Sequence, residues 1–410
     1  MDNIDDFNIS DGVLTDYSGG GGEVVIPDGV EYIGEYAFME QEGMTGVVIS
    51  SGVTSIGKHA FEKCAELKWV VIPSSLKGIG ADAFSGCELL EDCIIPEGAV
   101  FIGSGAFRGC VSLKNMFLPK GMESVGAYAF YNCSSLVEVT IPRETNFIAE
   151  GAFSSCPSLK SITVDEKNNC YSSVDGNLYS CGGTQLIAYA GGRNESIFEL
   201  PDCADVIAPC AFSGCLTIKD AIIHQNVRMI GAGAFSGCEN LKSVIIPRRV
   251  RHIEPSTFKN CYLLNKIIIP EGVERISQNA FLDCKGLREV VIQRESISMG
   301  GGIFDGCRNL ERVLCSQSIA ERMSDDIREI TLSGFLKRLA EGAVDAEEKR
   351  SWIEFIKENS LTAFKLMKDN ADFYRFALWN GCLNSDDADA VIAFTETLEC
   401  RVEVLEYKKK

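Results

Sequence analysis

The residues of this 410-residue chain that are best suited to chemistry are its 18 cysteines and three histidines. Thiolates attack electrophiles and bind soft metals, and paired thiols form disulfides in oxidising compartments. However, ten of the cysteines recur at one position of an internal repeat, where free cysteine behaves as a small buried hydrophobic residue. We call them the ladder cysteines and expect free, packed thiols, which fits a reducing compartment. They are Cys64, Cys87, Cys110, Cys133, Cys156, Cys215, Cys238, Cys261, Cys284 and Cys307.

The other reactive residues form no recognisable catalytic or metal-binding motif. Four cysteines surround an irregular repeat without the Cys-x-x-Cys spacing of a zinc pair: Cys170, Cys181, Cys203 and Cys210. The histidines belong to three different repeats: His59, His224 and His252. A Gly-x-Ser-x-Gly elbow, a phosphate-binding loop and a His-Glu-x-x-His motif are all missing from the sequence. We therefore predict no catalytic residues, no metal and no cofactor. A hydrolase using two carboxylates stays a remote alternative, although no acidic pair stands out.

Regularly spaced phenylalanines define the repeat on which the cysteines and histidines lie. Successive members of this series, the repeat phenylalanines, are 23 residues apart, except for one interval of 59 residues, which equals a normal step plus one of 36. A fixed period in the twenties is typical of a solenoid. The series is Phe38, Phe61, Phe84, Phe107, Phe130, Phe153, Phe212, Phe235, Phe258, Phe281 and Phe304.

Each repeat follows the pattern Leu-x-x-Val-x-Ile-Pro-x-Gly-Val-x-x-Ile-Gly-x-x-Ala-Phe-x-x-Cys. Alternating apolar residues that end at proline predict a short strand, because proline cannot donate to a ladder. The later glycine suits a sharp bend, and Ala-Phe begins a half-turn or short helix whose phenylalanine fills the interior. Stacked repeats would form a parallel sheet with strands about 4.8 Å apart. The predicted fold is an α/β solenoid, a right-handed superhelix of 23-residue repeats with a concave parallel β-sheet.

The Ile-Pro strand ends, Ile-Gly bends and Ala-Phe-x-x-Cys segments together resemble the BspA-like leucine-rich repeat family of bacteria and protists. They cover about three quarters of the chain. Asp165 to Tyr179, within a longer repeat at about 165–200, is similar to the hairpin-bearing variant repeat of that family. The resemblance implies a leucine-rich repeat fold and a binding function, because family members are mostly adhesion or interaction proteins, often surface-exposed.

Sequence composition divides the chain into three parts. Residues 1–22 contain a predicted hairpin and a glycine run, and we expect them to cap the first repeat. The solenoid itself is expected over 23–315. Residues 316–410 contain no proline and form a small all-α domain that would seal the last repeat. Helical periodicity there covers 333–339, 352–356, 363–367, 373–378 and 388–405, the last starting at a cap formed by Ser385 or a neighbouring aspartate.

Charge and hydrophobicity exclude several functions. The net charge of -19 argues against binding to nucleic acid or to anionic membranes. No segment approaches the roughly 20 apolar residues that membrane insertion requires. Residues 1–16 lack the basic and apolar regions of a signal peptide. The sequence as it stands therefore predicts a cytoplasmic protein, and a cell-surface or secreted one if a leader was removed.

The variable positions of the strands are the candidate binding site. In the strand that includes Trp69 and Val71, Val70 should point inward and these two residues outward, onto the concave face. The predicted partner-binding residues are Trp69, Val71, Ile94, Phe117, Thr140, Thr163, Ile222, Ile245, Ile268 and Val291. The positions equivalent to Val71 form what we call the outward row, which also includes Val25, Val48, Glu199 and Leu314.

An outward apolar row is unusual unless something covers it. The cover could be a protein or peptide ligand, a second copy of the chain, or the helical domain. Alternatively, β-branched residues simply favour strands and pack on one another across the ladder. The sequence thus favours a non-catalytic protein-protein interaction scaffold. A surface adhesin that binds host protein or glycan is the alternative, and it would require export.

Overall fold

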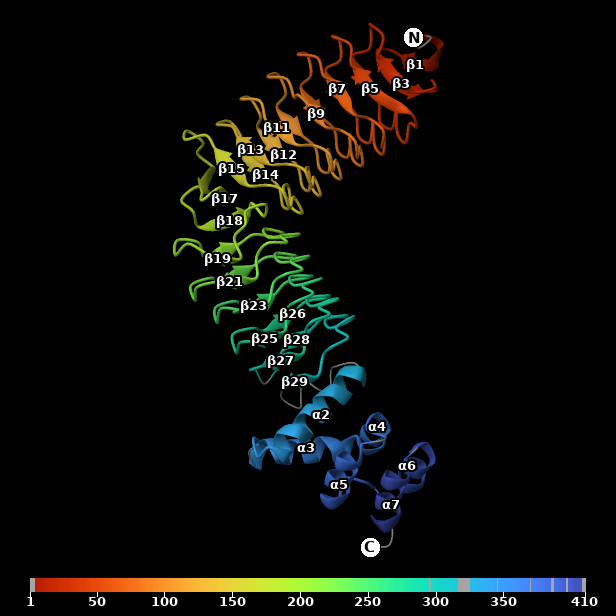
Figure 1. Ribbon diagram of the computed structural model, residues 1–410, viewed down its shortest axis with the longest axis vertical. Helices are drawn as coiled ribbons and strands as arrows, with labels where there is room; N and C mark the ends of the chain where they lie inside the picture. Colours follow the sequence, from red (N-terminus) through yellow and green to blue (C-terminus); the bar gives the residue numbers. More distant parts are fainter. Residues whose placement is uncertain are drawn as a thin grey trace.

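The computed structural model describes residues 4–294, 296–315, 325–344, 346–368, 370–384, 387–395 and 397–407. Stacked coils follow an arc and are succeeded by a group of helices (Figure 1). Each regular coil contains a first strand of two to five residues, which we call the long strand, a second strand of two residues and a series of turns. The predicted solenoid with a helical C-terminal region is confirmed.

The long strands form parallel ladders in which residues pair with those 23 positions later, as Val47 does with Val70 and Phe117 with Thr140, apart from a shift of one residue at Gly22. Alternate side chains are buried and exposed, as the apolar pattern requires. The strands are β3 (Gly22–Val25), β5 (Met44–Val48), β7 (Trp69–Val71), β9 (Asp92–Cys93), β11 (Asn115–Phe117), β13 (Glu138–Ile141), β15 (Ser161–Val164), β19 (Ile197–Glu199), β21 (Asp220–Ile222), β23 (Ser243–Val244), β25 (Lys266–Ile269), β27 (Glu289–Ile292) and β29 (Arg312–Leu314).

A second parallel ladder precedes the Ile-Gly bend, where the sequence pattern predicted only the bend. Gly103 explains the close stacking, because a Cβ there would lie 2.5 Å from the backbone nitrogen of Ala81 in the previous coil. The two-residue strands are β4 (Tyr32–Ile33), β6 (Ser55–Ile56), β8 (Gly78–Ile79), β10 (Phe101–Ile102), β12 (Ser124–Val125), β14 (Phe147–Ile148), β20 (Val206–Ile207), β22 (Met229–Ile230), β24 (His252–Ile253), β26 (Arg275–Ile276) and β28 (Ser298–Met299).

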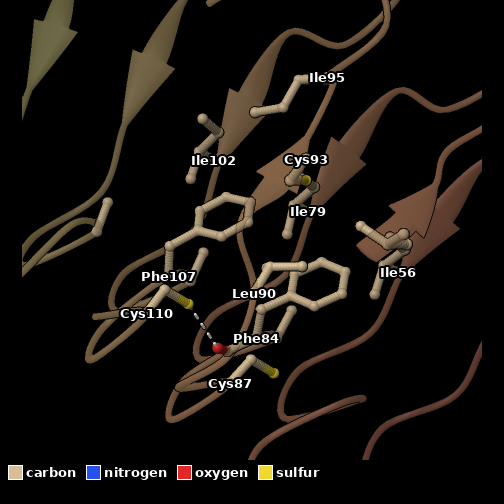
Figure 2. Packing of buried hydrophobic residues seen from close by; sticks show 14 of the residues in the cluster. Ile56, Ile79, Phe84, Cys87, Leu90, Cys93, Ile95, Ile102, Phe107 and Cys110 are labelled. Carbon is tan, nitrogen blue, oxygen red and sulfur yellow. Dashed lines mark hydrogen bonds between the residues drawn. The ribbon is translucent and has the colours of Figure 1, made fainter. Parts of the chain in front are cut away.

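The repeat phenylalanines stack through the interior. The rings of Phe84 and Phe107 lie 5.4 Å apart and are tilted by only 8°, and both are fully buried (Figure 2). The Ala-Phe segment forms turns rather than a helix. Its backbone pairs with the next coil, since the Phe84 amide donates to the Ala106 carbonyl at 2.7 Å. Each coil is therefore tied to the next on its turn side as well as on its strands.

The long repeat inserts an antiparallel unit made of β16 (Tyr171–Val174), β17 (Asn177–Ser180) and β18 (Gln185–Ala188). Tyr189 replaces the missing phenylalanine, 36 residues after Phe153 and 23 before Phe212. Its ring is buried and lies 5.1 Å from that of Phe212. Ala188-Tyr189 therefore corresponds to the Ala-Phe pair of the regular repeats. The buried residues of the solenoid fall into two clusters, which meet at this long repeat.

A hairpin covers the first coil. It follows η1 (Ile4–Asp6) and consists of β1 (Phe7–Ser10) and β2 (Val13–Tyr17), and β2 pairs with β4. The Tyr17 ring lies 5.1 Å from that of Phe38, so it continues the aromatic stack to the end of the solenoid. Apolar surface that an open end would expose is thereby buried.

The helices are α2 (Asp325–Ala340), α3 (Ala346–Glu358), α4 (Ser360–Leu366), α5 (Ala371–Trp379), α6 (Ala388–Phe394) and α7 (Leu398–Tyr407). The single helix predicted over 388–405 was wrong, because α6 ends at Phe394 and is followed by the buried residue Thr395, whose backbone is extended. The Thr395 hydroxyl donates to the Val391 carbonyl and lies 2.8 Å from the Tyr374 hydroxyl. Ser385, the first of the predicted caps, and the domain boundary at 316 lie outside the described residues. Asp387, one of the neighbouring aspartates, occupies the N-cap position of α6, but its side chain accepts no capping hydrogen bond within the described part of the chain.

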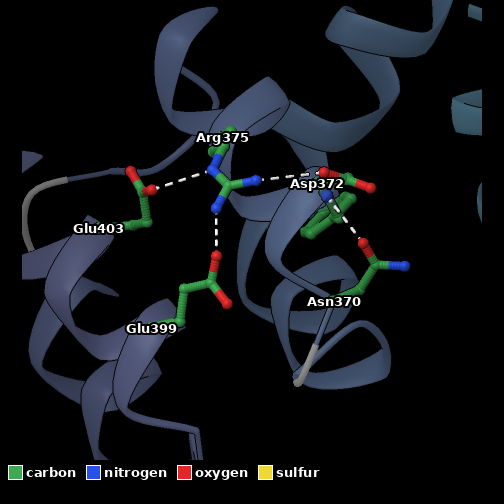
Figure 3. Close-up of polar contacts among 6 residues, drawn as sticks. Asn370, Asp372, Arg375, Glu399 and Glu403 are labelled. Atoms are coloured by element: carbon green, nitrogen blue, oxygen red, sulfur yellow. Dashed lines mark hydrogen bonds and ion pairs between the residues drawn. The ribbon is translucent and has the colours of Figure 1, made fainter. Parts of the chain in front are cut away.

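These helices pack around a core of their own and also contact the solenoid. Arg375 joins α5 to α7, with its Nε 3.1 Å from Glu403 and its terminal nitrogens next to Glu399 and Asp372 (Figure 3). Helix α2 packs against β29, the last strand of the solenoid.

Candidate functional site

The structure places the predicted binding residues on the long strands in two groups, one from Trp69 to Thr163 and one from Ile222 to Val291, with the inserted strands β16 to β18 and strand β19 between them. The most exposed side chains are Ile94 at 74%, Phe117 at 71% and Ile245 at 69%. Val71, Thr140, Thr163, Ile222 and Ile268 are also exposed, whereas Trp69 and Val291 are partly buried. The alternating inward positions, such as Val139 and Ile267, are buried. One side of the ladder therefore presents apolar groups to solvent.

The outward row consists of two apolar sections separated by a polar one. The first section runs from Val25 to Phe117 and the second from Ile222 to Leu314. Between them lie Thr140 and Thr163, whose hydroxyls are 2.9 Å apart, and the exposed Glu199. The inserted strands β16 to β18 occur in this same middle part. Any ligand that spans the whole row would meet apolar, polar and again apolar surface.

The described helices leave most of the second section uncovered. Helix α2 reaches β29, where Leu314 is partly buried, but Ile222, Ile245 and Ile268 keep half or nearly half of their surface exposed. Of the three covers that the sequence left open, the described helices therefore do not provide one for these residues.

Trp69 lies flat across the neighbouring strand. A Cβ at Gly46 would lie 2.2 Å from the Trp69 ring, so only glycine leaves room for the indole. The contact explains why Trp69 is partly buried, unlike Val71 two residues later. It also holds a large aromatic face in one position on the surface.

Sequence reasoning missed a second set of exposed aromatic residues on the short ladder. Phe101 and Phe147 are 39% and 56% exposed, and Phe101 lies across Gly78, where a Cβ would approach its ring to 2.1 Å. The signal was the position directly before the isoleucine of each bend, Ile102-Gly103 for Phe101 and Ile148-Ala149 for Phe147. It went unnoticed because a bend, not a strand, was expected there.

Charged side chains accompany the second apolar section two residues before the row. Glu289 lies between two cations, 2.5 Å from Lys266 and 3.4 Å from Arg312. Further along, the Ser243 hydroxyl donates to the Asp220 carboxylate at 2.6 Å. Exposed apolar groups next to a polar margin are typical of protein interfaces.

The ladder cysteines are buried or nearly so, and nine of them donate to a carbonyl of the preceding coil. Cys110 Sγ, for example, is 3.2 Å from the Phe84 carbonyl oxygen (Figure 2). Burial raises the pKa of Cys64 and Cys156 to about 12. Because the thiolate is the reactive form, these groups are inert near neutral pH.

The histidines lie on separate coils beside ordinary partners. His59 stacks on Tyr36 with its Nδ1 2.7 Å from the Glu62 carboxylate, and His224 Nε2 is 3.1 Å from the Pro201 carbonyl. Within the described ranges, no three His, Cys, Asp or Glu side chains form a group suited to a metal ion. In the same part of the chain, every helix is too short or too polar to cross a membrane.

Comparisons with known proteins agree with this architecture. The model of the BspA type leucine rich repeat region matches residues 22–110, 78–199 and 205–325. A leucine rich cell surface protein from Faecalibacterium prausnitzii is 29% identical, with a TM-score of 0.60 over 77% of this chain and 92% of that one. No curated protein matches the chain.

The pneumococcal vaccine antigen PcpA shares the fold, with 22% identity and a TM-score of 0.64 over 76% of this chain and 85% of its own. The repeat motif, the coil geometry and the family match over most of the chain agree. This chain belongs to the BspA-type leucine-rich repeat family.

Proposed function

We propose that this protein is a non-catalytic interaction scaffold that binds a protein or peptide on the outward row. The observation that supports the proposal is the exposure of Ile94, Phe117 and Ile245, on a strand face that no other part of the described chain covers. Exposed apolar surface that recurs on neighbouring coils, as it does within each of the two sections, marks interaction sites. The stacked coils hold these side chains at fixed spacing, so little conformational entropy is lost on binding.

A peptide-display library selected against the wild-type protein provides a defined test. Peptides that bind the row should lose at least tenfold in affinity for the double variant I245K/I268K, because a charge would be placed inside the apolar contact. Leu263→Lys is the matched control, since Leu263 is also exposed but lies in a turn outside the row. Equal binding to the wild type and the double variant would refute the site.

The second candidate is a surface adhesin that binds a host protein or glycan. It is favoured by the similarity to the cell surface protein of Faecalibacterium prausnitzii. Labelling intact cells of the native organism with a membrane-impermeant reagent distinguishes the two candidates. Labelled protein supports the adhesin, and labelling only after lysis supports a scaffold in the cytoplasm.

A further inference from the structure

The geometry points to a reversible disulfide between Cys170 and Cys181, at the base of the inserted hairpin. Both side chains are exposed and both thiols are free. Cys170 directly precedes Tyr171 and Cys181 directly follows Ser180, the residue paired with Tyr171, and the Cys181 amide donates to the Cys170 carbonyl at 2.8 Å. The two cysteines are therefore direct cross-strand neighbours.

Direct neighbours in an antiparallel pair have side chains on the same face and Cα atoms about 5.5 Å apart when hydrogen-bonded. That separation falls within the roughly 4.4 to 6.8 Å that a disulfide spans. The Cβ atoms of a hydrogen-bonded pair lie about 5.5 Å apart, beyond the roughly 3.5–4.5 Å of a relaxed disulfide, so the strand ends must move about 1 Å closer and the bond formed is strained and readily reduced. The buried ladder thiols differ, because each occupies its own layer and lies out of reach of solvent.

The surroundings keep the two cysteines in register. At one end of the hairpin, Asp175 and Gly176 have positive φ values of 49° and 72°, as a two-residue turn requires. At the other end, the Cys170 amide donates to the side chain of Asn168. Asn168 is itself buried and donates to the carbonyls of Pro142 and Thr145. A one-residue slip would break these contacts.

A small disulfide such as oxidised glutathione supplies the oxidising equivalents. One cysteine thiolate attacks a glutathione sulfur, forms a mixed disulfide and releases one glutathione thiolate. The second cysteine thiolate then attacks the protein sulfur of that mixed disulfide and releases the other glutathione. Two protein thiols are oxidised, one glutathione disulfide is reduced to two thiols, and a dithiol reductant reverses the reaction. Exposed disulfides of this kind are the labile, regulatory ones.

The test uses the full-length native protein, treated with oxidised glutathione, then alkylated and digested with trypsin without reduction. Both cysteines fall in one tryptic peptide, residues 168–193, because no lysine or arginine separates them. We expect this peptide to lose both alkylation sites and to carry no glutathione. Dithiothreitol should restore both sites.

Two variants sharpen the result. Cys181→Ser should leave Cys170 as a mixed disulfide with glutathione, whereas Cys203→Ser should leave the intramolecular bond unaffected. Cys203 is the informative control because it approaches the same loop, with its Sγ 3.5 Å from the Gly183 carbonyl. The proposal is overturned if both sites stay alkylated, if each cysteine carries glutathione, or if peptide 168–193 is cross-linked to residues 194–219 through Cys203.

Discussion

Single residues of the repeat have separate tasks in this solenoid, and cysteine is the clearest case. A ladder thiol fills a small apolar volume and also donates a hydrogen bond to a carbonyl of the preceding coil, as Cys110 does to Phe84. Alanine would lose both contacts, and serine would place a stronger hydrogen-bonding group in the same apolar site. The choice of residue therefore follows from packing and hydrogen bonding, without any need for thiol chemistry.

Burial of the ladder thiols should make the free energy of unfolding fall as the pH rises in the alkaline range. Burial raises the pKa of Cys64 and Cys156 in the folded protein to about 12 from an ordinary value of about 9, and it raises the pKa of Cys110 as well. The unfolded chain therefore releases these protons first, and the stabilisation, complete below about pH 9, should be lost between about pH 9 and pH 12. We expect the free energy of unfolding in urea to be lower at pH 10 than at pH 8.

Cys110→Ala tests whether the ladder thiols cause this pH dependence of stability. At pH 7 we expect a loss of about 1–2 kcal/mol from the missing contacts. Between pH 8 and pH 10 this variant should lose less stability than the wild type, because it has one buried thiol fewer. Cys170→Ala, at an exposed site, should keep the wild-type pH dependence. A wild-type pH dependence in Cys110→Ala would contradict the explanation.

Each coil is stabilised mainly by its neighbours, as expected for a stack of repeats. The ring centre of Phe107 lies 5.4 Å from that of Phe84 and 5.5 Å from that of Phe130, so one aromatic side chain contributes to the packing of three coils. The strands add parallel ladders on two sides, and the turns add a third set of backbone hydrogen bonds.

Phe107→Ala should therefore lower the free energy of unfolding by about 3–5 kcal/mol, the usual cost of a cavity left by a buried phenylalanine. Urea denaturation followed by circular dichroism measures the change. Phe117→Ala is the matched control, since Phe117 lies one coil further along but is exposed, and it should change stability by no more than about 0.5 kcal/mol. Equal losses in the two variants would contradict the division into core and outward residues.

The molecule as a whole is a solenoid closed at both ends. The hairpin β1–β2 covers the first coil, and α2 packs on the last strand, β29. Ile330 of α2 packs against the second core cluster of the solenoid. Gly334 permits the close approach, because a Cβ there would lie 3.3 Å from Arg312 Cγ.

Ile330→Asp should weaken this contact, because it places a carboxylate against an apolar surface. We expect differential scanning calorimetry to show a lower melting temperature, with the helical domain unfolding separately from the solenoid. Glu329→Asp changes the adjacent exposed residue and should have little effect. If both variants melted like the wild type, the contact between α2 and the solenoid would be energetically unimportant.

The sequence by itself determined the coil, because the 23-residue spacing of phenylalanine and cysteine records contacts between successive turns. It also determined which strand residues point outward, since side chains alternate along a strand whatever surrounds it. The second ladder was not predictable, because its strands are only two residues long. The end of α6 before Thr395 was not predictable either, because a tertiary hydrogen bond between Thr395 and Tyr374 opposes continuation of the helix. Only the tertiary structure decided that the helical domain leaves Ile222, Ile245 and Ile268 exposed, and that Cys170 faces Cys181. Both depend on how segments meet in space, which a repeat pattern does not encode.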